Sequence, residues 1–281
     1  MITQAVERTK MKRSGKIRRG LTAAGLTVLL LTGCFEQPEI SVPHFVPKSP
    51  PDSLEERGID AHPDNAVYLE WEEPGTADAE GILGYHVYRG KIVDEEYKFT
   101  RIATVNRSSG LLYDSDSYID NTANLDTMYY YYLKSYNDFT VSEANSDTAC
   151  YKLALKASPI EPSGNIYTDN PSFFYGYTPR RDSRINYLYF RLYYLEEGSY
   201  TEKYFVKTHR FDLSSYRFYV YLSNNNSHTT VLYEDLWRDN ENRPYLETGN
   251  YRWRVDAVSG ELGGAPETEG SESDWMYFTV K

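Results

Sequence analysis

The run Tyr129-Tyr130-Tyr131-Tyr132-Leu133-Lys134-Ser135-Tyr136 decides the fold class of this chain. Successive side chains of a β-strand point to opposite faces. The odd-numbered residues of the run are therefore predicted to face a core, and the even-numbered ones to face outward. No helix-period pattern runs through this stretch, so it indicates a strand.

Shorter alternating runs precede it, separated by turn residues. They are Val67-x-Leu69-x-Trp71, the stretch Gly84–Gly90 with Tyr85 and Val87, and the region of Phe99, Ile102 and Val105. The chain contains 28 tyrosines, a residue that favours strands because its ring covers a pleated surface. The pattern predicts an all-β protein built from β-sandwiches.

The first 34 residues have the layout of a secretory signal peptide. A basic head precedes an apolar stretch from Leu21 to Leu31, too short to span a hydrocarbon core of about 30 Å as a helix. The stretch ends in Leu31-Thr32-Gly33-Cys34. The alternatives are an ordinary signal peptide with a chance cysteine and an uncleaved anchor. Met11 is a second candidate start.

The run ending at Cys34 resembles the lipobox of bacterial lipoproteins. The resemblance implies that residues 1–33 are removed, that Cys34 receives lipid, and that the mature chain is held on a membrane by that lipid alone. Phe35, where an aspartate would retain such a protein at the inner membrane, implies delivery to the outer membrane. Cys150 would then be a lone thiol, because it is the second of only two cysteines.

The mature chain is expected to be strongly acidic. The whole sequence carries a net charge of −11, and removal of residues 1–33 leaves 23 basic and 40 acidic residues, a net charge of −17. Such a charge excludes a general attraction to nucleic acid. Residues 34–52 hold five prolines and predict an extended tether between the lipid and the folded part.

Residues 53–157 resemble a fibronectin type III domain. The matching residues are Val67-x-Leu69-x-Trp71 with Pro74, then Gly84–Gly90, Tyr118-x-Asp120 and the Tyr129 run. The resemblance implies that Trp71 is the core tryptophan and that Tyr129 is the tyrosine corner, bonded to upstream backbone.

Residues 158–281 resemble a second such immunoglobulin-like sandwich, with Tyr251 as its tyrosine corner. Tyr216–Leu222 is assigned to the strand beside it. That assignment leaves residues 185–206 as an inserted hairpin. The alternative makes Asn186–Leu195 itself strand B, the second strand of the sandwich, and the residues before it strand A. Periodicity does not choose between them.

Two outward faces are predicted as candidate binding surfaces, because Tyr and Arg are enriched in binding hot spots. The first, with His86 beside it, is Tyr88, Tyr130, Tyr132 and Tyr136. The second is Arg217, Tyr219, Tyr221, Arg252 and Arg254. Cross-strand pairing alone explains such residues equally well, at about 0.2–1 kcal/mol per pair.

Catalytic and metal-binding motifs are missing from the sequence. The five histidines are scattered, and no nucleophile elbow or phosphate loop occurs. Asp114–Asp120 is a weak calcium alternative that lacks the glycine and distal glutamate of an EF-hand. We therefore expect no enzyme, cofactor or metal. The predicted function is a lipid-anchored envelope protein that binds a protein partner or acts as a spacer; the alternative is a carbohydrate-binding accessory lipoprotein.

Overall fold

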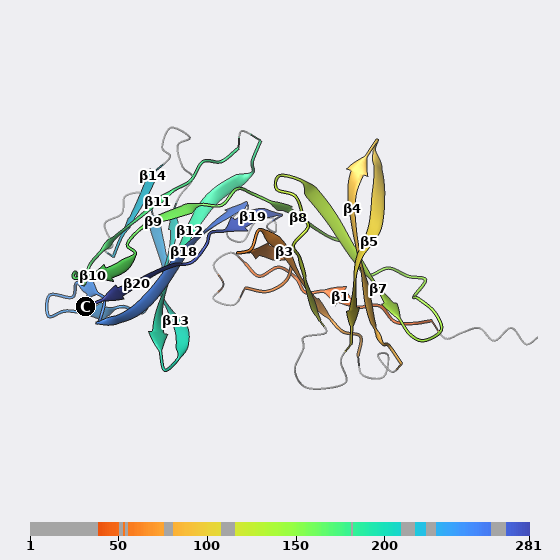
Figure 1. Cartoon of the computed structure of the whole chain (residues 1–281), viewed down its shortest axis with the longest axis horizontal. Helices are drawn as coiled ribbons and strands as arrows, with labels where there is room; N and C mark the ends of the chain where they lie inside the picture. Colours follow the sequence, from red (N-terminus) through yellow and green to blue (C-terminus); the bar gives the residue numbers. More distant parts are fainter. Residues whose placement is uncertain are drawn as a thin grey trace, which may run out of the picture. The chain divides into compact units, whose positions relative to one another are not determined.

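The computed structural model describes residues 39–50, 53, 56–75, 81–107, 116–180, 182–208, 217–222, 229–259 and 268–281. Every regular element in these ranges is a β-strand, so the all-β prediction is confirmed (Figure 1). The described residues include no helix that is long and apolar enough to cross a membrane. Glu39–Lys281 forms one compact unit, in which two sandwich-like halves have separate cores. Cys34 and the signal segment lie outside the described residues.

The first half pairs two sheets around one core. One sheet contains β1 (His44–Phe45), β3 (Ala66–Glu72), β2 (Asp60–His62) and β6 (Ser117–Asp120). The other contains β8 (Ala149–Leu153), β7 (Met128–Tyr136), β4 (Gly84–Val93) and β5 (Glu96–Asn106). Burial alternates along β7 as predicted, with Tyr131 and Leu133 fully buried, and Trp71 lies in the core between the sheets.

The segment expected to be a free tether is partly folded. β1 pairs with β3, placing Phe45 opposite Trp71, and Phe45 and Val46 are both buried. The tether prediction is therefore wrong for residues 44–50, because these two apolar side chains join the core and the extended backbone between prolines suits an edge strand. Residues 34–38 lie outside the described ranges.

The second half has the same two-layer construction. Its smaller sheet contains β9 (Ser158–Glu161), β11 (Ser172–Gly176) and β14 (Arg217–Tyr221). Its larger sheet contains β15 (Thr229–Glu234), β13 (Ser199–Thr208), β12 (Ile185–Glu196), β18 (Gly249–Ser259), β20 (Met276–Val280) and β10 (Gly164–Ile166). A short ribbon is formed by β16 (Trp237–Arg238) and β17 (Pro244–Tyr245).

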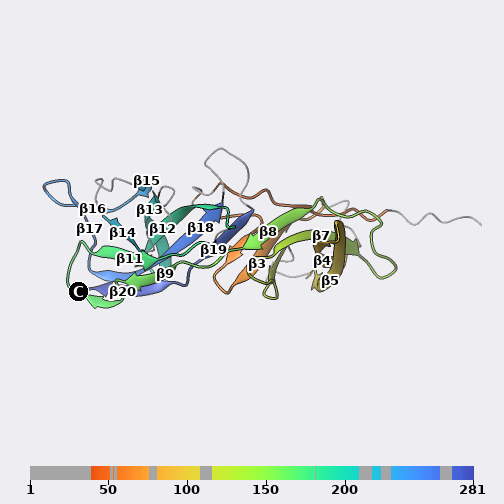
Figure 2. The ribbon, with the colours of Figure 1, turned by 90° about the horizontal axis from the view of Figure 1, so that it is seen from above.

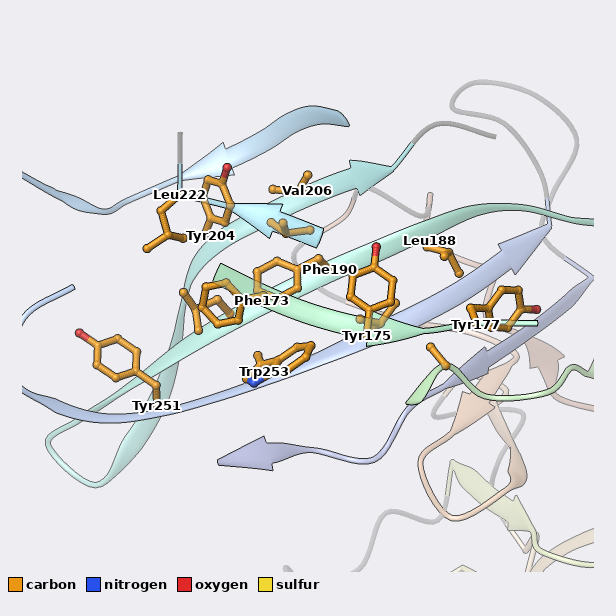
Figure 3. Close-up of a cluster of buried hydrophobic side chains, with 14 of the residues drawn as sticks. Phe173, Tyr175, Tyr177, Leu188, Phe190, Tyr204, Val206, Leu222, Tyr251 and Trp253 are labelled. Atoms are coloured by element: carbon orange, nitrogen blue, oxygen red, sulfur yellow. The ribbon is translucent and has the colours of Figure 1, made fainter. Parts of the chain in front are cut away.

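Aromatic side chains from both layers fill the space between them (Figure 3). Phe173 of β11 contacts Phe190 of β12 and Trp253 of β18, with ring centroids 4.7 and 5.4 Å apart. Each of the three side chains is fully buried. The burial of several large rings, at about 25 cal/mol per Å² of apolar surface, is the main contribution to the stability of this half.

β12 and β13 form the predicted hairpin, but the hairpin is not an insertion. β12 pairs with β18 from Ile185 to Tyr194, so it is a central strand of the larger sheet. β14, expected beside β18, pairs with β11 in the opposite sheet instead. The reason is that β12, with 12 residues, matches the 11-residue β18 along its length, whereas β14 has only 5 residues. The alternative is right that residues 186–195 are a strand of the sandwich itself, but they are not strand B, because they pair with β18 while β11 lies in the opposite sheet.

The two tyrosine-corner predictions have different outcomes. The Tyr251 hydroxyl donates a hydrogen bond to the Glu247 carbonyl at 2.8 Å, as predicted. The Tyr129 hydroxyl instead accepts a hydrogen bond from the Asn124 side chain at 3.0 Å.

One sheet continues through both halves. β19 (Glu269–Glu272) pairs antiparallel with β18 and parallel with β8, where Glu269 lies opposite Lys152 (Figure 2). The Lys152 and Ala154 amides donate to the carbonyls of Thr268 and Gly270 at 2.9 and 2.8 Å. Lys152 also forms an ion pair with Glu269, with Nζ and Oε2 3.0 Å apart. Backbone and charge together therefore join the halves.

Candidate binding surfaces

The outer face of β4, β5 and β7 carries a cluster of aromatic rings. Tyr88 and Tyr132 lie opposite each other on β4 and β7, with their rings stacked at 4.7 Å and nearly parallel. Tyr130, two residues before Tyr132, lies on the same face and is half-buried. These three predicted residues are therefore brought together.

Two further rings in this cluster come from β5 and were not predicted. Phe99 contacts Tyr132 and Tyr97 contacts Tyr130, at centroid distances of 4.8 and 4.9 Å. The two-residue turn Asp94-Glu95, with both φ angles positive, folds β5 back beside β4 and sets this register. The sequence signal was the Tyr97-x-Phe99 spacing after a turn. We call Tyr88, Tyr97, Phe99, Tyr130 and Tyr132 the aromatic face.

Gly90 allows one of these rings to lie across the sheet. A Cβ atom at this position would lie 2.6 Å from Cδ1 of Phe99, closer than two carbon atoms can approach. Gly90 is paired with Phe99 on one side and Tyr130 on the other. The glycine therefore opens the space through which Phe99 reaches the ring of Tyr132.

Tyr136, the fourth predicted residue, lies at the other end of β7. Its ring stacks on His86 at 4.6 Å. His86 was expected to be outward-facing but is only 8% exposed, with Nδ1 3.0 Å from the Thr104 hydroxyl. Burial, with the nearby charge of Arg101, lowers the pKa of His86. The His86–Tyr136 pair is therefore packed against its neighbours and does not form an exposed binding surface.

The second predicted face does not exist as one surface. Tyr219 and Tyr221 lie with Arg217 on β14 in the smaller sheet, whereas Arg252 and Arg254 lie on β18 in the larger one. The error follows from the misplacement of β14 as a neighbour of β18. The two tyrosines remain about half exposed, and their rings are nearly parallel.

Arg254 belongs to a buried charge cluster that the sequence did not reveal. Arg191 on β12 lies opposite Arg254 on β18, and both side chains are almost fully buried. Glu56 bridges them: its Oε1 lies 2.9 Å from Arg191 Nη2, and its Oε2 lies 2.7 Å from Arg254 Nη2. A carboxylate from the N-terminal segment thus neutralises two like charges on adjacent strands.

Three other carboxylates complete the charge cluster. Arg191 pairs with Glu202 at 3.2 Å and with Asp256 at 2.8 Å, and Arg254 pairs with Glu272 at 2.6 Å. Burial raises the pKa of each of these three acids, against the lowering effect of the arginines. The pKa of Glu56 is lowered to about 2, because the charges of Arg254, Arg191 and Lys48 outweigh its burial. Glu56 is therefore the most firmly ionised member.

A small cavity of about 20 Å³ adjoins this cluster and has room for one water molecule. Carboxylate oxygens of Glu56, Asp60 and Glu272 lie within 4.8 Å of one another there, a spacing that a metal ion could use. Arg254 already contacts Glu56 and Glu272, and Lys48 contacts Asp60. These neighbouring cations make the group an ion-pair network rather than a metal centre.

The remaining candidates have structural partners. Asp120, in the weak calcium alternative, is fully buried and accepts hydrogen bonds from Arg89 and from the Tyr131 hydroxyl. Asp114 lies outside the described residues. Cys150 on β8 is a free thiol opposite Tyr130, and burial raises its pKa.

Replacement of Glu56 tests the charge cluster. Glu56→Gln should lower the free energy of unfolding at pH 7 by about 2–3 kcal/mol, less than for a fully buried pair because the side chain is 31% exposed. The lowered pKa of Glu56 means that its stabilisation is present above about pH 4.5 and is lost as pH falls toward 2. Urea unfolding should therefore show the difference between wild type and variant shrinking from pH 5 downward.

Glu241→Gln is the matched control, because this carboxylate is 73% exposed and pairs with an exposed arginine. It should change stability by less than about 0.5 kcal/mol. A Glu56→Gln effect that is absent, or equally large at pH 3 and pH 7, would contradict the assigned role.

No protein-family model matches the sequence, and no curated protein matches it. The functional interpretation therefore rests on the residues and their geometry.

Proposed function

We propose that this chain is a bacterial lipoprotein that presents two fibronectin type III-like sandwiches at the cell envelope and binds a partner without catalysis. The observation that carries the binding role is the aromatic face, where five rings from three strands meet on one outer surface. The lipid anchor is supported by the run Leu31-Thr32-Gly33-Cys34 behind a basic, apolar leader.

The strand order supports the fold part of the proposal. In each half two sheets face each other, and one of the two contains the run β8-β7-β4-β5 in the first half and β20-β18-β12-β13 in the second. Fibronectin type III-like domains are sandwiches of this kind. The Tyr251 hydrogen bond to backbone four residues upstream is a second supporting feature.

The aromatic face suits a protein partner. The rings stack on one another, so they are held rigidly, and Tyr97 is 56% exposed beside Ile92, which is 51% exposed. Rigid tyrosines lose little conformational entropy on binding and combine apolar area with a hydroxyl. The aromatic face therefore has the chemistry that binding of a protein partner needs.

A carbohydrate ligand is the second candidate, and Tyr219 and Tyr221 favour it. They are 51% and 46% exposed on β14, and their rings lie 6.3 Å apart with an interplanar angle of 11°. Two exposed, nearly parallel rings on one strand can stack on the faces of sugar units. A glycan screen without any hit would remove this candidate.

The anchor is tested by Cys34→Ser. The wild-type chain, expressed in a bacterial host and labelled with radioactive palmitate, should carry label and sediment with membranes. The variant should lose the label, because serine offers no thiol to acylate. Cys150→Ser is the control and should remain labelled. Equal labelling of wild type and Cys34→Ser would refute the lipoprotein assignment.

The aromatic face is tested by alanine at Tyr88, Tyr130 and Tyr132, each made separately. Capture of a partner from detergent-solubilised envelope should fall at least about tenfold, as for other binding hot spots. The free energy of unfolding should fall by no more than about 1 kcal/mol per lost cross-strand pair. Tyr167→Ala, on an 85% exposed ring elsewhere, is the control and should change neither quantity. Unchanged capture together with a large loss of stability would make the face structural.

A further inference from the structure

Arg252 lies beside the charge cluster on the same outer face of the larger sheet, yet its surroundings differ. It precedes Arg254 by two positions on β18, and its cross-strand neighbours are Tyr193 and Tyr277. Its guanidinium lies over the rings of Trp275, Tyr200 and Tyr193, at 4.0, 4.2 and 5.2 Å from their centroids. We call Arg252 and these three rings the arginine cage.

The guanidinium in this cage has no carboxylate within ion-pair distance among the described residues. Its Nε atom is buried and has no hydrogen-bond acceptor there. The rings compensate part of its charge through cation–π attraction. They do not accept the hydrogen bonds that a guanidinium donates in its own plane.

The chain itself shows which group these surroundings accommodate. Two residues away, Arg254 pairs with the carboxylate of Glu56 at 2.7 Å. Arg191 pairs with the other oxygen of the same carboxylate at 2.9 Å. On this face of the sheet, a carboxylate from a distant part of the chain is therefore the group that the neighbouring arginines bind.

We propose that the arginine cage binds a carboxylate side chain, Asp or Glu, on an acidic segment of a partner protein. The three rings around the guanidinium restrict its movement, and its planar fork can make a bidentate contact with a planar carboxylate. Tyr277, 53% exposed and 6.4 Å from the Tyr200 ring, extends the apolar rim around the contact. The site lies on the second half, so a test of the arginine cage does not depend on whether the aromatic face binds a partner.

The test measures binding of hexaglutamate to the full chain by NMR, following the Trp275 indole and the Arg252 Nε–H signals. Wild type should show saturable shifts of both signals, weakened by salt. Arg252→Gln should weaken binding at least about tenfold, which corresponds to about 1.4 kcal/mol. Arg252→Lys, which keeps the charge but not the planar fork, should weaken it severalfold. Arg243→Gln, at a 68% exposed arginine in a loop, should have no effect.

Three outcomes would overturn the proposal. The first is unchanged hexaglutamate affinity in Arg252→Gln, even if its melting temperature falls, because the cage would then be structural. The second is tighter binding of trigalacturonate than of hexaglutamate, which would indicate an acidic saccharide. The third is the absence of saturable shifts with hexaglutamate in wild type. If Arg252→Gln does not fold, the hexaglutamate affinity of Arg252→Lys is compared with that of wild type, and an unchanged affinity overturns the proposal.

Discussion

The bridge from Glu56 to Arg191 and Arg254 is the contact on which the arrangement of the second half's outer face depends. Two arginines side by side on adjacent buried strands would repel each other in a medium where charges are weakly screened. Glu56 offers one oxygen to each of them, and Asp256 lies within ion-pair distance of both. Removal of the bridge leaves the two buried arginines with Asp256, Glu202 and Glu272, three acids whose pKa values burial raises, and takes away the one acid of the cluster whose pKa is lowered.

The same bridge connects regions that are distant in the chain. Glu56 and Arg254 are 198 residues apart in sequence, and Glu56 belongs to the segment between β1 and β2 of the first half. The parallel pairing of β8 with β19 lies close by in the fold and continues the sheet from one half into the other. Local packing builds each core, while these two contacts make Glu39–Lys281 a single unit.

The positions of the strands could be predicted from the sequence more accurately than the pairing of one strand with another. The alternation around Leu133 and around Trp71 correctly predicted which side chains are buried, because a strand's period is visible within a few residues. The position of β14 was not visible, because five alternating residues pair equally well with either sheet. Phe45 was missed because a two-residue strand has no period at all. The role of Glu56 depends on two arginines that are distant in the sequence, one of them 198 residues away.

The central claim is that the two halves unfold together because they share a sheet and a charge cluster. Differential scanning calorimetry of residues 34–281 tests it most directly. The account predicts one transition, with a calorimetric enthalpy equal to the van't Hoff enthalpy. Two resolved transitions, or a calorimetric enthalpy about twice the van't Hoff value, would show that the halves unfold independently and would contradict it.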